Sequence, residues 1–174
     1  EVSVLHWPED QQVDPTALDA ALSEDPSLEH VVVVHCETTT GILNDMVEIG
    51  RVCGTHKRRL IIDGMSAFGA IPIDGESIPF DALIASSNKC LEGVPGMAFA
   101  LIRKKFLELA EGNAHSLALD LYEQWRGLEA NGQWRFTPPT HVLAAFDQAL
   151  AEHREEGGVP ARHKRYSANR DILV

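Results

Sequence analysis

Residues 86–96 have the composition of a turn that presents a reactive lysine. They read Ser-Ser-Asn-Lys-Cys-Leu-Glu-Gly-Val-Pro-Gly and follow an apolar run, 81–85, so Lys89 comes just after the end of a predicted strand. A lysine amine can bind an aldehyde as an imine. Most lysines are solvated surface charges, but the position of Lys89 after a strand and small polar residues favours a desolvated, imine-forming amine.

Asp63 is the second residue whose position suggests chemistry, because it closes the apolar run 59–63. A carboxylate near a pyridine nitrogen keeps that nitrogen protonated, and the ring then draws electrons. An aspartate and a lysine at neighbouring strand ends are therefore the minimum protein equipment for pyridoxal 5'-phosphate (PLP). By itself, Asp63 fits equally well a strand-end residue that caps the next turn.

Thr38 stands in a third polar segment, Thr-Thr-Thr-Gly at 38–41, which follows the valine run 31–34. Its hydroxyl is predicted to bond the cofactor's ring oxygen or a substrate group. Taken alone, the segment is an ordinary threonine turn at a strand end.

The elements that position these residues predict an α/β fold with a mostly parallel sheet. Residues 31–35 form a continuous β-branched run, which is typical of a strand buried on both faces. Further strands are predicted at 59–63 and 81–85. A strand at 97–102 is expected to be antiparallel, because the link at 93–96 is too short for a parallel crossover.

Helices are predicted between and after these strands. Asp14 and Asn44 are the expected N-caps of the first two helices, and later helices are expected at 117–128, 140–156 and 162–174. Ligands of such folds bind beyond the carboxyl ends of the strands. Thr38, Asp63 and Lys89 are therefore expected at one edge of the sheet.

Charge and composition exclude several classes of partner. The 174 residues carry a formal net charge of -11, which argues against nucleic acid and against an anionic membrane surface as partners. The three cysteines have no C-x-x-C spacing, so we predict a reducing, cytoplasmic location and no zinc site. No apolar stretch approaches eighteen residues, and the first residue is Glu1, which suggests a fragment of a longer chain.

Five motifs occur in one order along the chain. They are HCETTTG (35–41), IDGMSAFGAIPID (62–74), SSNKCLEGVPG (86–96), SLALDLYEQW (116–125) and WRFTPPTH (134–141). Together they resemble the 2-aminoethylphosphonate–pyruvate aminotransferase family, a branch of the class V aminotransferases of PLP fold type I. The resemblance implies a partial large domain of three-layer α/β/α architecture. It also implies transfer of the amino group of 2-aminoethylphosphonate to pyruvate, giving phosphonoacetaldehyde and alanine.

The resemblance also implies roles for individual residues. Lys89 becomes the imine-forming lysine that moves the proton during transamination, and Asp63 becomes the partner of the pyridine nitrogen. Thr38 matches the position facing the ring oxygen, Met65 the one that packs under the ring, and Asn88 one near the phosphate.

Two further residues lie in the motif at 134–141, where two prolines hold the segment before the helix in an extended conformation. Thr137 matches the threonine that reaches the phosphate of the partner subunit's cofactor in a homodimer. Arg135 is expected to bind an anionic substrate group, an assignment that rests on its charge and position alone. Without the resemblance, the residues of this segment indicate only a loop that leads into the helix. The expected division is 1–140 as the central part of the PLP-binding domain and 141–174 as helices that lead toward a small domain.

Two other functions stay open from the sequence. One is another class V aminotransferase, of the alanine– or serine–glyoxylate type, because the PLP machinery is shared. The other is a non-catalytic fragment of the same fold. Asn88 before Lys89 counts against the cysteine desulfurase branch, where a histidine is expected.

Overall fold

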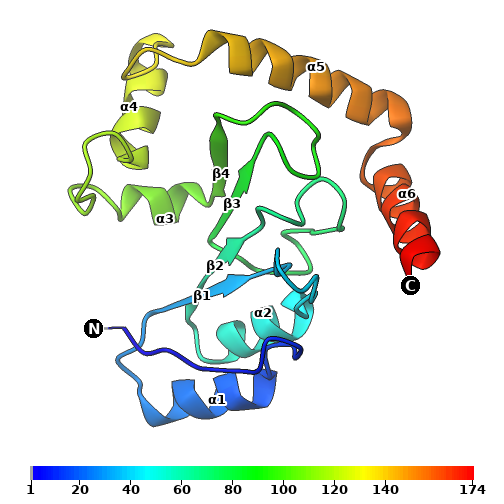
Figure 1. Ribbon diagram of the computed structural model, residues 1–174. Coiled ribbons are helices and arrows are strands. Elements are labelled where there is room, and N and C mark those ends of the chain that lie inside the picture. Colours follow the sequence, from blue (N-terminus) through cyan, green and yellow to red (C-terminus); the bar gives the residue numbers. More distant parts are fainter. Residues whose placement is uncertain (1) are drawn as a thin grey trace.

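The computed structural model describes residues 2–174, which form an α/β structure around a four-stranded sheet (Figure 1). The strands lie side by side in chain order: β1 (His30–Val34), β2 (Arg59–Asp63), β3 (Ala82–Ser86) and β4 (Ala98–Ile102). The first three are parallel, and β4 pairs antiparallel to β3. The predicted α/β class, mostly parallel sheet and antiparallel last strand are confirmed.

The helices alternate with the early strands and then follow one another. They are α1 (Pro15–Glu24), α2 (Met46–Thr55), α3 (Lys104–Glu108), α4 (Leu121–Asn131), α5 (Thr140–Glu156) and α6 (Gly158–Leu173). The helix expected at 117–128 is shifted, because Asp120 accepts the Glu123 N–H and starts α4 there. The short helix α3 was not predicted.

One face of the sheet forms the core. Val33, Ile62 and Leu83 pair across β1, β2 and β3, and Ile62 and Leu83 are fully buried in one apolar cluster with residues of α1 and α2. The expectation that β1 is buried on both faces is wrong, since Val32 is 71% exposed. The reason is that β1 is the edge strand and only one helical layer is complete in the described part of the chain.

The N-cap of α2 also differs from the prediction. Asp45, not Asn44, caps this helix, and its carboxylate accepts the N–H groups of Val47 and Glu48. Asn44 is buried, accepts the Val13 N–H and donates to the Val34 carbonyl oxygen. It therefore joins the segment before α1 to the end of β1, a role that depends on tertiary contacts.

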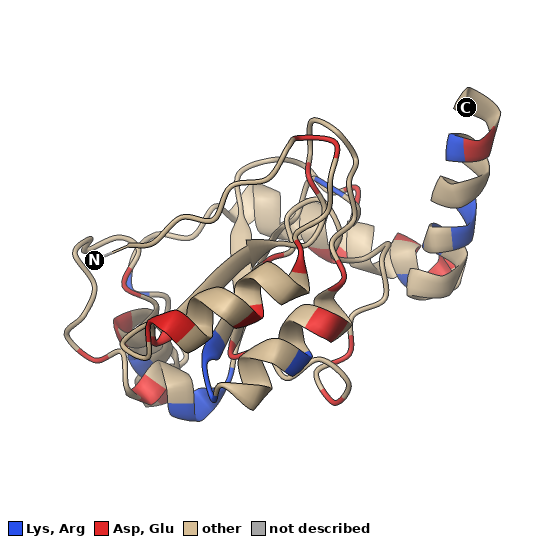
Figure 2. Cartoon of the chain, turned by 90° about the horizontal axis from the view of Figure 1, so that it is seen from below, with Lys and Arg blue, Asp and Glu red and all other residues tan. Residues whose placement is uncertain are grey.

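Helices α5 and α6, the C-terminal arm, curve over the loops that follow β2 and β3 (Figure 1). The buried His153 on α5 donates from Nε2 to the Gly69 carbonyl oxygen at 2.7 Å. Phe146 stacks on Phe99 of β4 with ring centroids 5.6 Å apart. The far end of α6 projects from the rest of the chain and carries charges of both signs (Figure 2).

The corner between α5 and α6 carries a carboxylate with an unusual proton affinity. Hydrogen bonds from Arg165 and Arg162 lower the pKa of Glu156 to about 2. An unfolded glutamate titrates near pH 4.3, so the stabilisation from Glu156 is complete above that pH and is lost as the pH falls toward 2.

Glu156→Gln is therefore expected to lower the melting temperature most above about pH 5, where the carboxylate is charged in both states. The deficit should shrink as the pH falls from 4.3 toward 3. Melting curves between pH 7 and 3 measure this difference in melting temperature. Glu155→Gln is the control, because Glu155 is an exposed neighbour on the same helix. A deficit that is the same at every pH would contradict the assigned charge pairing.

Candidate active site

The carboxyl ends of the three parallel strands meet at one edge of the sheet. In the register, Val34 pairs with Asp63, and Asp63 pairs with Ile84. Thr38, Asp63 and Lys89 follow at or just after these ends, so the structure puts the three predicted residues on neighbouring strand ends of one edge.

Ser66 links the three loops of this edge. Its hydroxyl shares a 2.7 Å hydrogen bond with the Thr38 hydroxyl. Its carbonyl oxygen accepts from the Cys90 thiol at 3.3 Å, one residue after Lys89. Ser66 was not among the residues predicted from the sequence, where the one pointer to it is its place in the Gly-Met-Ser loop directly after Asp63.

The Asp63 carboxylate is half-buried and uses one oxygen to shape its own loop. Its Oδ1 accepts the N–H of the half-buried Met65 at 2.9 Å. This contact is the turn-capping role that the sequence left open as an alternative. No cation of residues 2–174 forms an ion pair with Asp63, so the carboxylate retains acceptor capacity for a further group.

The turn that carries Lys89 is closed by short backbone contacts. The Glu92 N–H bonds the Lys89 carbonyl oxygen, and the Gly93 N–H bonds the Ser87 carbonyl oxygen, both at 2.8 Å. The buried Ser87 hydroxyl donates to the Val94 carbonyl oxygen at 2.7 Å. A Cβ on Gly93 would lie 2.8 Å from the Ser87 oxygen, so only glycine fits this close approach.

Lys89 and its neighbour Asn88 are exposed. The expected desolvation of Lys89 is therefore not found, because the turn projects from the sheet edge and nothing in residues 2–174 covers it. The Lys89 amine forms no hydrogen bond or ion pair with any described residue, which leaves it accessible to an aldehyde.

Two other titratable side chains near this edge are held neutral. Burial raises the pKa of the Cys90 thiol, and burial lowers the pKa of His35. Both effects disfavour the charged form. Cys90 thus matches the small buried residue expected from the sequence, not a nucleophile.

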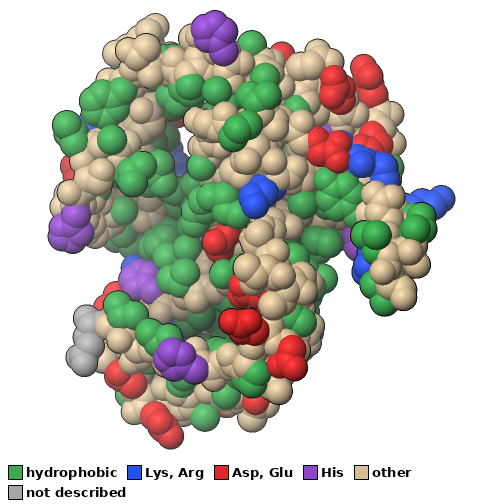
Figure 3. Space-filling view, in the orientation of Figure 1, with side chains coloured by type: hydrophobic (Ala, Val, Ile, Leu, Met, Phe, Trp, Pro, Cys, Tyr) green, Lys and Arg blue, Asp and Glu red, His purple; other side chains and the backbone are tan. Residues whose placement is uncertain are grey.

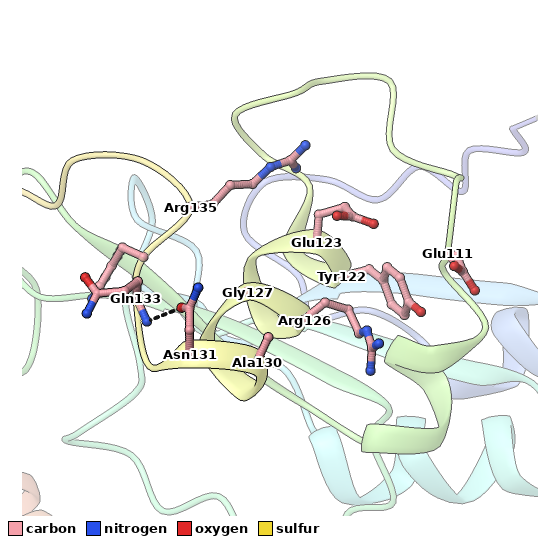
Figure 4. A pocket seen from close by; sticks show the side chains of 10 residues that line it. Glu111, Tyr122, Glu123, Arg126, Gly127, Ala130, Asn131, Gln133 and Arg135 are labelled. Atoms are coloured by element: carbon pink, nitrogen blue, oxygen red, sulfur yellow. Dashed lines mark hydrogen bonds between the residues drawn. The ribbon is translucent and has the colours of Figure 1, made fainter.

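Arg135 and Thr137 lie apart from this edge, and no described contact joins them to the Lys89 turn. The Arg135 guanidinium donates to the Leu117 carbonyl oxygen at 3.3 Å and lies 3.7 Å from the Asp120 carboxylate. Figure 4 shows Arg135 at the rim of an open hollow of about 630 Å³ beside α4. Thr137 is exposed in the following loop.

Residues 2–174 contain no group of three or more His, Cys, Asp or Glu side chains placed to hold a metal ion. None of the helices in this part of the chain has the length and apolar character needed to cross a membrane.

A lysine and an aspartate at adjacent ends of parallel strands are compatible with many classes of enzyme. Comparison with known proteins identifies the family. The family model described as aminotransferase class V matches residues 1–172. The chain belongs to the class V aminotransferase family.

Curated relatives narrow the resemblance further. The 2-aminoethylphosphonate–pyruvate transaminase of Pseudomonas putida is 57% identical over 172 residues, which are 99% of this chain and 47% of the relative. A relative of the same name, numbered 2, in Burkholderia lata is 50% identical over 174 residues, or 100% of this chain and 46% of the relative. The chain thus spans about half the length of the curated relatives it matches.

Solved structures agree on the fold. The pyridoxamine–pyruvate aminotransferase of Mesorhizobium loti superposes with a TM-score of 0.83 at 26% identity, over 92% of this chain and 42% of that one. An alanine–glyoxylate aminotransferase of Nostoc sp. also gives 0.83, at 22% identity over 96% and 45% of the two chains. The expected fold type is confirmed for the part that this chain covers.

Proposed function

We propose that the protein containing this chain is a PLP-dependent aminotransferase that moves the amino group of 2-aminoethylphosphonate to pyruvate, giving phosphonoacetaldehyde and alanine. The observation that carries the proposal is the placement of Asp63 at the end of β2 and of Lys89 just after the neighbouring strand β3, each without an ionic partner among residues 2–174. The 57% identity to a relative of this name supports the choice of substrates.

The chemistry of the donor set fits PLP. When bound, PLP supplies an aldehyde and an electron-withdrawing pyridinium ring. The accessible Lys89 amine would bind the aldehyde as an imine and carry the proton that must move during amino transfer. The Asp63 carboxylate, with its remaining acceptor capacity, would hold the proton on the ring nitrogen.

The remaining predicted residues would orient the same group. Thr38 would donate its hydroxyl toward the ring oxygen, supported by its hydrogen bond to Ser66. Met65 would pack beneath the ring, and Asn88 would bind near the phosphate. These assignments follow the resemblance, and the placement of Thr38, Met65 and Asn88 on the loops beside Asp63 and Lys89 supports them.

We propose a homodimer for the whole protein, in which Thr137 reaches the phosphate at the partner's site and Arg135 serves an anionic substrate group. Exposed apolar side chains around α3 and α4 support an interface there (Figure 3); they are Leu109, Leu117, Leu119, Leu121, Trp134 and Phe136. Residues 1–140 would then be part of the PLP-binding domain, and 141–174 helices that lead to a small domain. The three free cysteines suit the cytoplasm.

A comparison of amino donors tests this proposal in the full-length protein. With pyruvate as acceptor, kcat/KM for 2-aminoethylphosphonate should exceed that for serine by at least about 100-fold, because a site built for a phosphonate leaves charged groups unpaired with other donors. Equal or faster transfer from serine, or from alanine to glyoxylate, would favour the alternative class V activity. No transfer from any donor would favour a non-catalytic protein.

A further inference from the structure

A buried arginine on the C-terminal arm contacts the turn that carries Lys89. Arg162 of α6 is 2% exposed, although arginine is rarely buried unless its charge is paired. Its Nη1 donates to the carbonyl oxygen of Cys90, the residue after Lys89 and 72 positions away in the sequence. A backbone carbonyl in a turn is thus held by a side chain from a distant helix.

The remaining nitrogens of Arg162 are held by two carboxylates. Nε and Nη2 donate to the Glu156 carboxylate at 2.7 and 2.6 Å, and Nη2 lies 3.6 Å from Glu92. The planar guanidinium therefore spans the arm and the turn at once. A lysine could not make this set of contacts, because its amine lacks the fork of donors.

The Glu92 side chain, in the same turn, bonds two further residues of the arm. Glu92 has a left-handed backbone with φ of 58°, and its carboxylate accepts from Arg165 and from the Tyr166 hydroxyl, each within 3.0 Å. Burial alone would raise the pKa of Glu92, but these hydrogen bonds and the charges of Arg162 and Arg165 outweigh it and lower the pKa. Glu92 is thus a carboxylate at neutral pH and pairs with the arm.

We propose that Arg162 is a positioning residue for Lys89: its guanidinium, itself held by Glu156 and Glu92, binds the Cys90 carbonyl oxygen and so fixes the direction in which the turn presents the lysine amine. The inference rests on the proposed function, since it gives Lys89 the imine-forming role. The orientation of the reactive Lys89 amine then depends on Arg162 of the C-terminal arm, in addition to the loops at the strand ends.

Arg165 provides a matched comparison. It bonds the same two carboxylates, Glu92 and Glu156, but does not contact the backbone of the turn. Loss of Arg165 therefore removes charge pairing alone, whereas loss of Arg162 also releases the Cys90 carbonyl. Arg170, which among residues 2–174 pairs only with the adjacent exposed Asp171, controls for removal of a positive charge from α6.

The test uses the full-length protein with PLP and the variants Arg162→Met, Arg162→Lys, Arg165→Met and Arg170→Met. Three quantities are measured: kcat and KM for amino transfer, the pH midpoint of the imine absorbance band, and hydrogen exchange of the Glu92 and Gly93 amides. Arg162→Met should lower kcat about 10- to 100-fold, as is usual for loss of an orienting partner, with little change in KM. It should also move the pH midpoint and speed exchange of both amides. Arg162→Lys should fold but recover kcat only in part, and Arg165→Met and Arg170→Met should stay close to wild type.

A folded Arg162→Met or Arg162→Lys protein with unchanged kcat, pH midpoint and amide exchange would overturn the inference, even if its melting temperature falls. If Arg162→Met does not fold, the same three measurements on Arg162→Lys decide whether Arg162 positions Lys89. A wild-type protein that forms no imine at Lys89 overturns the proposed function instead, and amide exchange in the variants then still shows whether Arg162 holds the turn.

Discussion

Lys89→Ala is expected to lower the rate of amino transfer by at least about 10³-fold, because it removes both the amine that binds the aldehyde and the group that moves the proton. Lys89 is exposed and without a partner among residues 2–174, so its loss should leave the melting temperature nearly unchanged. Single-turnover transfer from 2-aminoethylphosphonate, measured in the full-length protein, gives the rate.

Lys105→Ala is the control for this substitution, since Lys105 is an exposed lysine on α3. It should transfer the amino group at the wild-type rate. If Lys89→Ala still transfers the amino group at a rate near that of Lys105→Ala, Lys89 is not the catalytic lysine.

Asp63→Asn should lower the transfer rate by about 10²- to 10³-fold, which is the usual cost of losing one oriented electrostatic partner. The amide oxygen can still accept the Met65 N–H, so the loop should keep its shape. Without the negative charge, the ring nitrogen loses its proton more easily and the ring draws electrons less strongly. Imine formation at Lys89 should continue. The PLP absorbance therefore reports imine formation, and the transfer rate reports the loss of the Asp63 charge.

Asp74→Asn is a close control, because the Asp74 carboxylate makes the same kind of contact, accepting an N–H two residues later, from Glu76 at 3.0 Å. Asp74 is exposed and lies away from the strand ends. If Asp63→Asn transfers the amino group as fast as Asp74→Asn, Asp63 only caps its turn, as the alternative interpretation of the sequence holds.

The strand ends were predictable because they depend on local patterns. Continuous β-branched and apolar runs predicted β1 to β3 within one residue, and their shared direction brings Thr38, Asp63 and Lys89 to one edge. Helix α5 was predicted with its observed bounds, since apolar residues recur along one face of 140–156 and Gly157, which takes the left-handed conformation, ends the helix.

The remaining features depend on contacts between distant segments. Asn44 is a good N-cap by type, but its amide instead joins Val13 to Val34. Val32 belongs to an apolar run, yet its exposure is set by the edge position of β1. Likewise, the contacts of Ser66 and Arg162 arise from loops and a helix that meet only after folding, so no local pattern predicted these contacts.

Borohydride reduction of the full-length protein with PLP, followed by peptide mass mapping, tests most directly whether Lys89 is the imine-forming residue. Reduction makes an imine permanent, so the modified peptide identifies the amine that formed it. We expect one phosphopyridoxyl adduct, confined to Lys89. No adduct, or adducts scattered over surface lysines, would contradict this expectation.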